Sequence, residues 1–351
     1  MQQVSWGGGF VKRSMSRVSL ALAAMLLGLL PLRAGAGTLD DARARGAVRC
    51  GVSGDLPGFS SAEEAGGWKG LDIAFCRAIA AAIFADPARV EFVPLAADEA
   101  FEALRARRID VLARNTPLTF AADAGAGINF AGVLFYDGQV FLVPRTLGIS
   151  SALELSGATV CVQKETGSEP NVATFFRSKG LPHETIVLET TEEMLQAYEI
   201  GRCNVVSAAS SRLNGLRLRL AKPDDHLVLP EVISKEPLGP AVRQGDDQWF
   251  DIVKWTLFAL IEGEELHLTR ANVDQMKQSS DPRIRRFLGS EEALGGQLGL
   301  DDGWAYQIVK QVGNYGEIFE ADLGQDSPLK IARGINDLWN ADGLHYAPPF
   351  R

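Results

Sequence analysis

Two neighbouring stretches decide the fold: AVRCGV at residues 47–52 and LDIAFCRAIAAAIF at residues 71–84. The first predicts a short strand. The second places Leu71, Phe75 and Ile79 at helical spacing, which predicts a helix with one apolar face. A strand followed by an amphipathic helix is the repeating unit of α/β proteins.

The alternation of strands and helices continues outward from these stretches and then repeats. Strands are predicted at 90–94, 109–113, 158–162, 185–188 and 203–207, and helices at 97–106, 171–179, 192–200 and 249–262. Such alternation indicates a parallel or mixed sheet. A chain of 351 residues is too long for one compact core. We therefore expect an α/β fold with two lobes.

The two sets of strands suggest where the chain passes between the lobes. We assign residues 37–143 to lobe 1, 150–236 to lobe 2 and 240–351 to the second part of lobe 1 with a C-terminal extension. The crossings are predicted at 143–149 and 236–239, and these are the expected hinges.

The first 36 residues have the composition of a secretory signal peptide. Three basic residues precede the apolar run 18–30, and the small residues Ala34, Gly35 and Ala36 follow it. The apolar run is shorter than the ~20 residues that a membrane-spanning helix needs. We therefore expect cleavage near Ala36 and a periplasmic location. Met15 is an alternative start, because the segment from there is a complete signal by itself.

Charge and cysteine content exclude several classes of site. The segment 1–36 carries four positive charges and no acid, so its removal shifts the formal net charge from −9 to −13. Nucleic-acid binding needs a basic face, so we expect no nucleic-acid partner. The four cysteines are widely spaced, which argues against zinc, and we expect no metal or cofactor. An even number in an exported protein permits disulfides, with three pairings open.

Several segments carry a specific resemblance to one family. They are GLDI at 70–73, DVLARNT at 110–116, NFA at 129–131, KEPLGPAVRQGD at 235–246, QVGNYGE at 311–317 and YAPPFR at 346–351. Together they resemble the periplasmic solute-binding proteins of the general L-amino-acid (polar amino acid) ABC importer family. The resemblance extends from about Thr38 to Arg351. It implies a type II periplasmic binding protein fold, a monomer without catalytic activity, and delivery of a small-molecule ligand to a membrane permease.

The resemblance and the fold both indicate a ligand cleft between the lobes. In open α/β sheets, ligands bind beyond the carboxyl ends of strands and at helix N-termini. The loops that follow strands 109–113 and 158–162 should therefore face each other. The candidate ligand-binding residues are Phe59, Asn115, Thr116, Thr119, Lys164, Thr166, Ser168 and Ser210.

The chain departs from the family pattern where an amino acid would be held by its charges. Ala122 stands where the family has an arginine for the carboxylate, and Ala209 where it has an aspartate for the ammonium. Losing a buried charge partner costs roughly 2–5 kcal/mol. We therefore expect weak binding of free amino acids. Lys164 would either replace the arginine or form an exposed ion pair with Glu165.

Three further interpretations follow from this divergence. The chain could be a divergent copy that binds a non-amino-acid ligand, a sensor subunit, or an enzyme that uses Glu165 or Glu169 as an acid or base.

The two lobes favour one disulfide pairing. Cys50–Cys76 and Cys161–Cys203 each join elements of one lobe, whereas pairs between the lobes would lock the cleft. We predict these two bridges.

Overall fold

A computed structural model describes residues 1–9, 37–63, 66–164 and 167–351. The chain divides into two compact units, Met1–Ala36 and Gly37–Arg351, which are described separately. Residues 1–9 of the first unit are exposed and form no helix or strand. The basic residues, apolar run and cleavage site of the predicted signal peptide lie outside the described residues.

The first lobe of the second unit is built on a five-stranded sheet, with the order β5-β1-β6-β15-β7. Its strands are β1 (Val48–Val52), β5 (Val90–Pro94), β6 (Val111–Leu112), β7 (Ile128–Phe130) and β15 (Ala241–Arg243). β1 is parallel to β5 and β6, whereas β15 is antiparallel to β6 and β7. The predicted strand at 47–52 is present as β1. A small sheet of β2 (Asp55–Leu56), β3 (Ser60–Ala62) and β4 (Trp68–Lys69) follows it.

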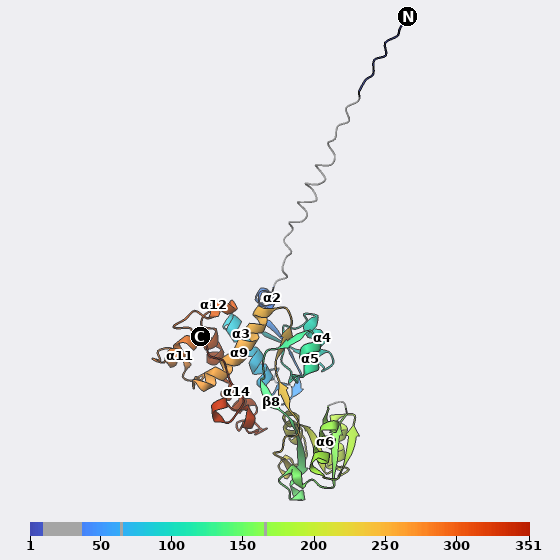
Figure 1. Cartoon of the computed structure of the whole chain (residues 1–351). Coiled ribbons are helices and arrows are strands. Elements are labelled where there is room, and N and C mark those ends of the chain that lie inside the picture. The colour runs from blue at the N-terminus through green and yellow to red at the C-terminus, as the bar shows by residue number, and fades with distance from the viewer. Residues whose placement is uncertain (10–36, 64–65, 165–166) are drawn as a thin grey trace. The chain divides into compact units, whose positions relative to one another are not determined.

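Helices pack on both faces of this sheet. Those before the second lobe are α2 (Thr38–Arg45), α3 (Leu71–Phe84), α4 (Ala100–Arg105) and α5 (Phe120–Gly125). Those after it are α9 (Asp247–Glu265), α10 (Val273–Met276), α11 (Pro282–Phe287), α12 (Gly295–Leu298), α13 (Trp304–Gln311) and α14 (Tyr315–Asp322), with 3₁₀ turns at Gly334–Asn336 and Trp339–Ala341. The predicted helix at 71–84 has the bounds of α3. The C-terminal helices gather on one side of the lobe (Figure 1).

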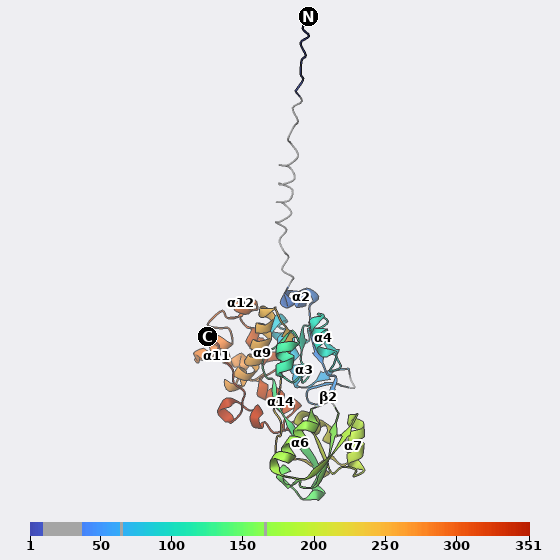
Figure 2. The same ribbon diagram turned by 45° about the vertical axis from the view of Figure 1, so that its right-hand side comes forward.

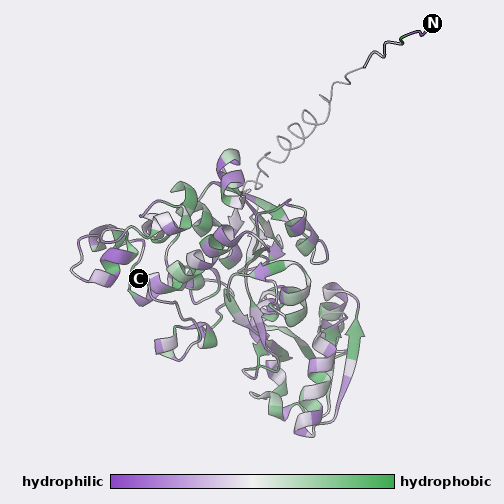
Figure 3. Cartoon of the chain, turned by 45° about the horizontal axis from the view of Figure 1, so that its top comes forward, coloured by the Kyte–Doolittle hydropathy of each residue, from purple (hydrophilic) through white to green (hydrophobic). Residues whose placement is uncertain are grey.

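The second lobe contains another five-stranded sheet, with the order β11-β10-β12-β9-β13. Its strands are β9 (Gln139–Pro144), β10 (Ala158–Gln163), β11 (His183–Leu188), β12 (Val205–Ala209) and β13 (His226–Val228). Its helices are α6 (Ser168–Lys179), α7 (Thr191–Glu199) and α8 (Ser210–Arg217), with 3₁₀ turns at Arg145–Leu147, Ala152–Glu154 and Pro223–Asp225. Figure 2 shows α6 and α7 against this sheet. The helices of this lobe carry both hydrophobic and hydrophilic residues, as expected of helices that cover a sheet (Figure 3).

Two antiparallel strands connect the lobes: β8 (Phe135–Asp137) and β14 (Glu236–Leu238). Figure 1 shows β8 where the two lobes meet. The strand β9, which the sequence assigns to the first lobe, pairs with β12 and β13 in the second. The first crossing therefore precedes residue 139 and is not at 143–149. The second crossing lies at β14, within residues 236–239.

Each lobe has its own core and its own disulfide. Trp249, Phe75 and Tyr315 are among the largest fully buried side chains of the first lobe. Cys50 of β1 is bonded to Cys76 of α3, with the Cα atoms 6.2 Å apart. Cys161 of β10 is bonded to Cys203, just before β12, with the Cα atoms 5.8 Å apart. Both predicted pairings are confirmed, and each fixes two neighbouring elements within one lobe.

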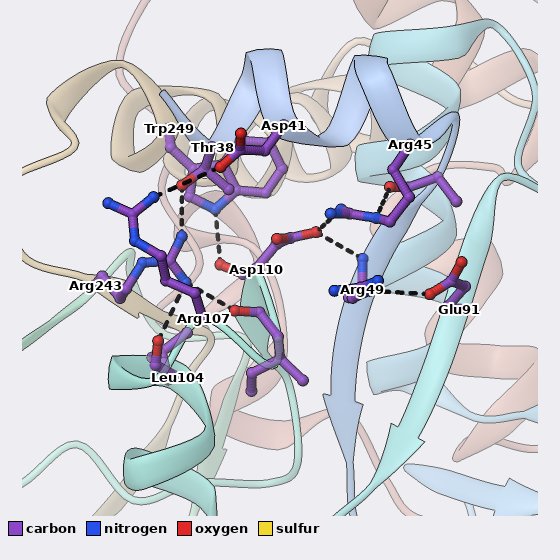
Figure 4. Close-up of polar contacts among 12 residues, drawn as sticks. Thr38, Asp41, Arg45, Arg49, Glu91, Leu104, Arg107, Asp110, Arg243 and Trp249 are labelled. Atoms are coloured by element: carbon purple, nitrogen blue, oxygen red, sulfur yellow. Dashed lines mark hydrogen bonds and ion pairs between the residues drawn. The ribbon is translucent and has the colours of Figure 1, made fainter. Parts of the chain in front are cut away.

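A polar network joins α2, β15 and α9 at the amino-terminal edge of the first sheet (Figure 4). The buried Asp110 carboxylate accepts hydrogen bonds from the Arg45 side chain and from the Arg49 backbone N–H. Arg243 donates to the carbonyl of Ile109 and to the Thr38 hydroxyl. These charged groups bind one another or the backbone, so we read the network as structural.

The described residues lack two features, a membrane-spanning helix and a cluster of metal-binding side chains. None of their helices is long and apolar enough to cross a membrane. No group of three or more of their histidine, cysteine and acidic side chains could hold a metal ion.

Candidate ligand-binding cleft

A cavity of about 540 Å³ lies between the two lobes. Its walls come from the segments that follow the carboxyl ends of the strands in both sheets, as expected of an α/β binding site. The first lobe supplies Ser53, Asp55, Leu56, Pro57, Ala97, Arg114, Asn115 and Pro117. The second lobe supplies Gln163, Ser168, Thr191, Glu192, Met194, Ala208, Ala209, Ser211, Arg212, Gly215, Leu216 and Arg219, and the connecting strands supply Asp137, Glu236 and Leu238.

The lobes touch each other across this cavity. The side-chain amide of Asn115 donates a hydrogen bond of 3.2 Å to the hydroxyl of Ser211. Asn115 has a φ of 57°, a left-handed conformation that asparagine adopts more readily than most residues. This turn lies three residues after the end of β6, in the segment that lines the cavity.

A buried carboxyl group lies behind the loop that carries Arg114. Burial raises the pKa of Asp72 to about 7, although the Arg114 charge and a hydrogen bond from the Asn115 backbone N–H oppose the rise. Asp72 Oδ2 and Arg114 Nε are both buried and have no hydrogen-bond partner among the described residues. Asp72 thus binds the backbone of Asn115 and, when ionised, adds a negative charge behind the cavity wall.

A second buried acid, Asp137 of β8, orients the start of α8. It accepts hydrogen bonds from the backbone N–H groups of Gly138 (2.8 Å) and Ser211 (3.2 Å). Burial raises the pKa of Asp137 to about 6. The two backbone hydrogen bonds and a hydrogen bond from the Ser211 hydroxyl lower this pKa but do not offset the effect of burial. The carboxylate is thus used within the protein, in holding α8 against the connecting strand.

Three arginines line the cavity, and their surroundings differ. Arg219 forms an ion pair with Glu192, and both side chains are largely exposed. Arg114 of the first lobe and Arg212 of α8 form no ion pair with the described residues. Two half-buried guanidinium groups, one from each lobe, therefore line the cavity without an ion-pair partner in the part of the chain that the structure describes.

The structure places only some of the predicted candidate residues on the cavity wall. Asn115 and Ser168 line the cavity. Thr116 is buried, with its hydroxyl unpartnered among the described residues. Thr119 caps α5 by accepting the Ala122 backbone N–H, and Ser210 contacts Asn214 within α8. Thr166 lies outside the described residues.

Lys164 and Phe59 are placed differently from what their predicted role needs. The Lys164 ammonium lies 2.9 Å from Glu189 Oε1, on an exposed part of the second lobe. Phe59 is 1% exposed and packs edge-to-face on Phe135, with the ring centroids 5.1 Å apart. Neither is among the described residues that line the cavity. Phe59 is therefore a core residue.

The two alanines that replace the family's charge anchors differ in position. Ala209 ends β12 and lines the cavity. Ala122 lies on α5, half-buried against the apolar cluster of the first lobe, and is not among the described lining residues. Glu169, a candidate catalytic acid, is exposed, and Glu165 lies outside the described residues. The cavity wall thus lacks the ammonium-binding aspartate, while Arg114 provides a cation.

The sequence interpretation overlooked Arg212 and assigned no ligand role to Arg114. Both follow the carboxyl end of a strand, Arg114 two residues after β6 and Arg212 three residues after β12. The strand-end rule that selected Asn115 would have selected these two cations as well.

Comparisons with known proteins agree on one family. The family model described as bacterial extracellular solute-binding proteins, family 3, matches residues 48–271. The general L-amino acid-binding periplasmic protein AapJ of Rhizobium johnstonii is 52% identical over 336 residues, covering 95% of this chain and 98% of its own. The glutamate/glutamine/aspartate/asparagine-binding protein BztA of Rhodobacter capsulatus is 43% identical, covering 97% and 100%.

A solved structure resembles this chain closely. It is a periplasmic binding protein of an ABC transporter from Brucella ovis with glutathione bound. The TM-score is 0.83 at 50% identity, and the match covers 90% of this chain and all of the other.

Proposed function

The chain belongs to family 3 of the bacterial extracellular solute-binding proteins and is a substrate-binding protein of the amino-acid ABC transporter type, and from this premise we propose that it captures a small anionic solute without an α-ammonium group. The family is a non-enzymatic component of transport. We also propose that the chain works as a monomer, closes its lobes on the solute and delivers it to the membrane permease of an importer.

The observation that carries this proposal is Ala209 on the cavity wall. An alanine methyl offers no hydrogen bond, so an α-ammonium buried against it would lose its hydration without compensation. Three of the acids in the lining are already engaged: Asp137 with α8, Glu192 with Arg219, and Glu236 with the Ser234 hydroxyl. Asp55 is exposed. A carboxylate has Arg114 available instead.

Calorimetry with a matched pair of solutes tests this proposal. Glutarate and L-glutamate share two carboxylates and differ by the α-ammonium. We expect glutarate to bind at least about tenfold more tightly, because only glutamate must desolvate an unpaired cation. The panel includes the twenty amino acids and glutathione, the ligand of the Brucella ovis structure, which has two carboxylates and one ammonium. Micromolar binding of a free amino acid would overturn the proposal.

Restoring the missing anion should reverse this preference. In Ala209→Asp, a carboxylate on the cavity wall supplies an ammonium partner and repels anions. We expect L-glutamate to gain about tenfold in affinity and glutarate to lose a similar factor. Ala209→Asn is the control of equal size, and an equal effect of both variants would show that side-chain volume is responsible.

Export is the second part of the proposal. Its support is the signal-like composition of residues 1–36 and the periplasmic location of relatives such as AapJ. We propose cleavage after Ala36, so mass spectrometry of the periplasmic protein should find Gly37 as the first residue. A chain that retains residues 1–36 would contradict this.

A further inference from the structure

We infer that the solute has two acidic groups, one bound by Arg114 of the first lobe and the other by Arg212 of the second. This inference rests on the proposed function and narrows it from an anion to a dianion. It makes Arg212 the residue of the second lobe that determines specificity.

The placement of the two guanidinium groups supports two separate anionic subsites. Arg114 follows β6 and Arg212 lies in the first turns of α8, so they enter the cavity from opposite lobes. An arginine binds a carboxylate through two parallel N–H donors, and a single carboxylate facing one guanidinium leaves the other unpaired. Two acidic groups on one solute would pair both.

The two arginines are close enough to affect each other. Burial lowers the pKa of Arg114, and the positive charge of Arg212 lowers it further. The negative charges of Asp72 and Asp55 act in the opposite direction. Neither arginine has an ion-pair partner within the described parts of the chain. Bringing two like charges together in a partly desolvated cavity is unfavourable, and a dianion that enters between them removes this repulsion.

The acids that line the cavity or lie behind its wall form no ion pair with Arg114 or Arg212 among the described residues. The exposed Asp55 acts on Arg114 only from beyond ion-pair distance, and Glu236 accepts a hydrogen bond from the Ser234 hydroxyl. Asp137 is bound to the backbone of α8, and Glu192 is paired with the third arginine, Arg219. Asp72 lies behind Arg114 with a pKa raised to about 7 by burial, so it is partly protonated near neutral pH. Ala208 and Ala209, beside Arg212 on the second lobe, contribute no charge.

The test compares a dicarboxylate with its half-amide. Glutarate and glutaramate have nearly the same shape, but one carboxylate of the first is an amide in the second. We expect the protein to bind glutarate at least about tenfold more tightly. In Arg212→Gln this preference should fall to within about threefold, through weaker binding of glutarate alone. Arg212→Lys keeps the charge and should restore part of the preference.

Arg217→Gln is the matched control. Arg217 lies on the same helix, contacts the Pro223 carbonyl at 3.5 Å and is not among the described lining residues, so its loss should leave both affinities unchanged. Succinate and adipate, measured in parallel, cover shorter and longer separations of the two acids.

Each result separates the inference from the proposed function. Equal binding of glutarate and glutaramate, or an unchanged preference in Arg212→Gln, overturns the inference and leaves the anionic solute standing. If glutamate binds more tightly than glutarate and binding still depends on Arg212, the solute does have an α-ammonium group. That result overturns the proposed function and leaves the inference of two acidic groups standing. Failure of all three dicarboxylates to bind overturns the inference.

Discussion

At the scale of single residues, Asp72 should make the protein less stable as the pH rises. Its pKa is about 7 in the folded state, raised by burial, against 3.8 for an ordinary aspartate. Between these values the unfolded chain releases a proton that the folded chain keeps. Folding stability therefore falls as the pH increases from about 4 to 7, and the penalty is complete above 7.

Replacing Asp72 by asparagine should remove this penalty. We expect Asp72→Asn to gain stability relative to the unchanged protein between pH 5 and pH 8, as measured by urea unfolding at both values. Each unit of pKa shift corresponds to about 1.4 kcal/mol. The exposed Asp326→Asn is the control for the loss of one charge. An identical stability difference at both pH values would contradict the raised pKa.

The position of Lys164 shows what could not be predicted from sequence at this scale. Its charge and its place after a strand both suggested a ligand contact. In the structure, β10 and β11 are parallel and Gln163 is in register with Leu188. The next residues along the two strands, Lys164 and Glu189, therefore become neighbours and form an ion pair. Strand register decides this pairing, and the local sequence does not contain it.

At the scale of elements, the C-terminal segment supports a connecting strand. Asn336, which is 4% exposed, accepts a hydrogen bond from the Tyr136 N–H at 2.7 Å and donates to the Tyr136 carbonyl at 2.9 Å. Tyr136 is the central residue of β8, which pairs with β14 on its other edge. Asn336 thus occupies the place of a third strand beside β8.

Removing this side chain should loosen β8. Asn336→Ala leaves the Tyr136 N–H and carbonyl without their partners, and we expect a loss of about 1–3 kcal/mol in unfolding free energy. Hydrogen exchange of the Tyr136 amide should become faster. Asn340→Ala, at an exposed position of the same segment, should change neither. Unaltered exchange at Tyr136 would show that Asn336 does not hold the strand.

Among the helices and strands, some were predicted correctly from the sequence and one was assigned to the wrong lobe. Helical periodicity located α3 correctly, and the assignment of one disulfide to each lobe was right. The strand β9 was assigned to the wrong lobe, because its sequence QVFLVP indicates a buried strand but not its partners. Its pairing with β12 and β13 depends on segments more than sixty residues later in the chain.

At the scale of the whole molecule, binding should change the arrangement of the lobes. β8 and β14 connect them, and solute-binding clefts close by rotation about a few such residues. We expect small-angle X-ray scattering of the exported protein to differ between the free and the glutarate-saturated states. Arg212→Gln, if it no longer binds glutarate, should show no change. Identical curves with and without bound solute would argue against hinge closure.

The contact between Thr38 and Asp246 has a consequence for maturation. The Thr38 N–H donates to Asp246 Oδ2 at 2.7 Å, and a Cβ atom on Gly37 would lie 3.9 Å from each carboxylate oxygen. Cleavage after Ala36 would create a new α-amino group at Gly37, mostly protonated at neutral pH, next to this carboxylate. The processed chain would gain an ion pair that the precursor lacks. We therefore expect proteolytic processing to tighten the attachment of α2 to α9, so that the protein reaches its full stability only after export.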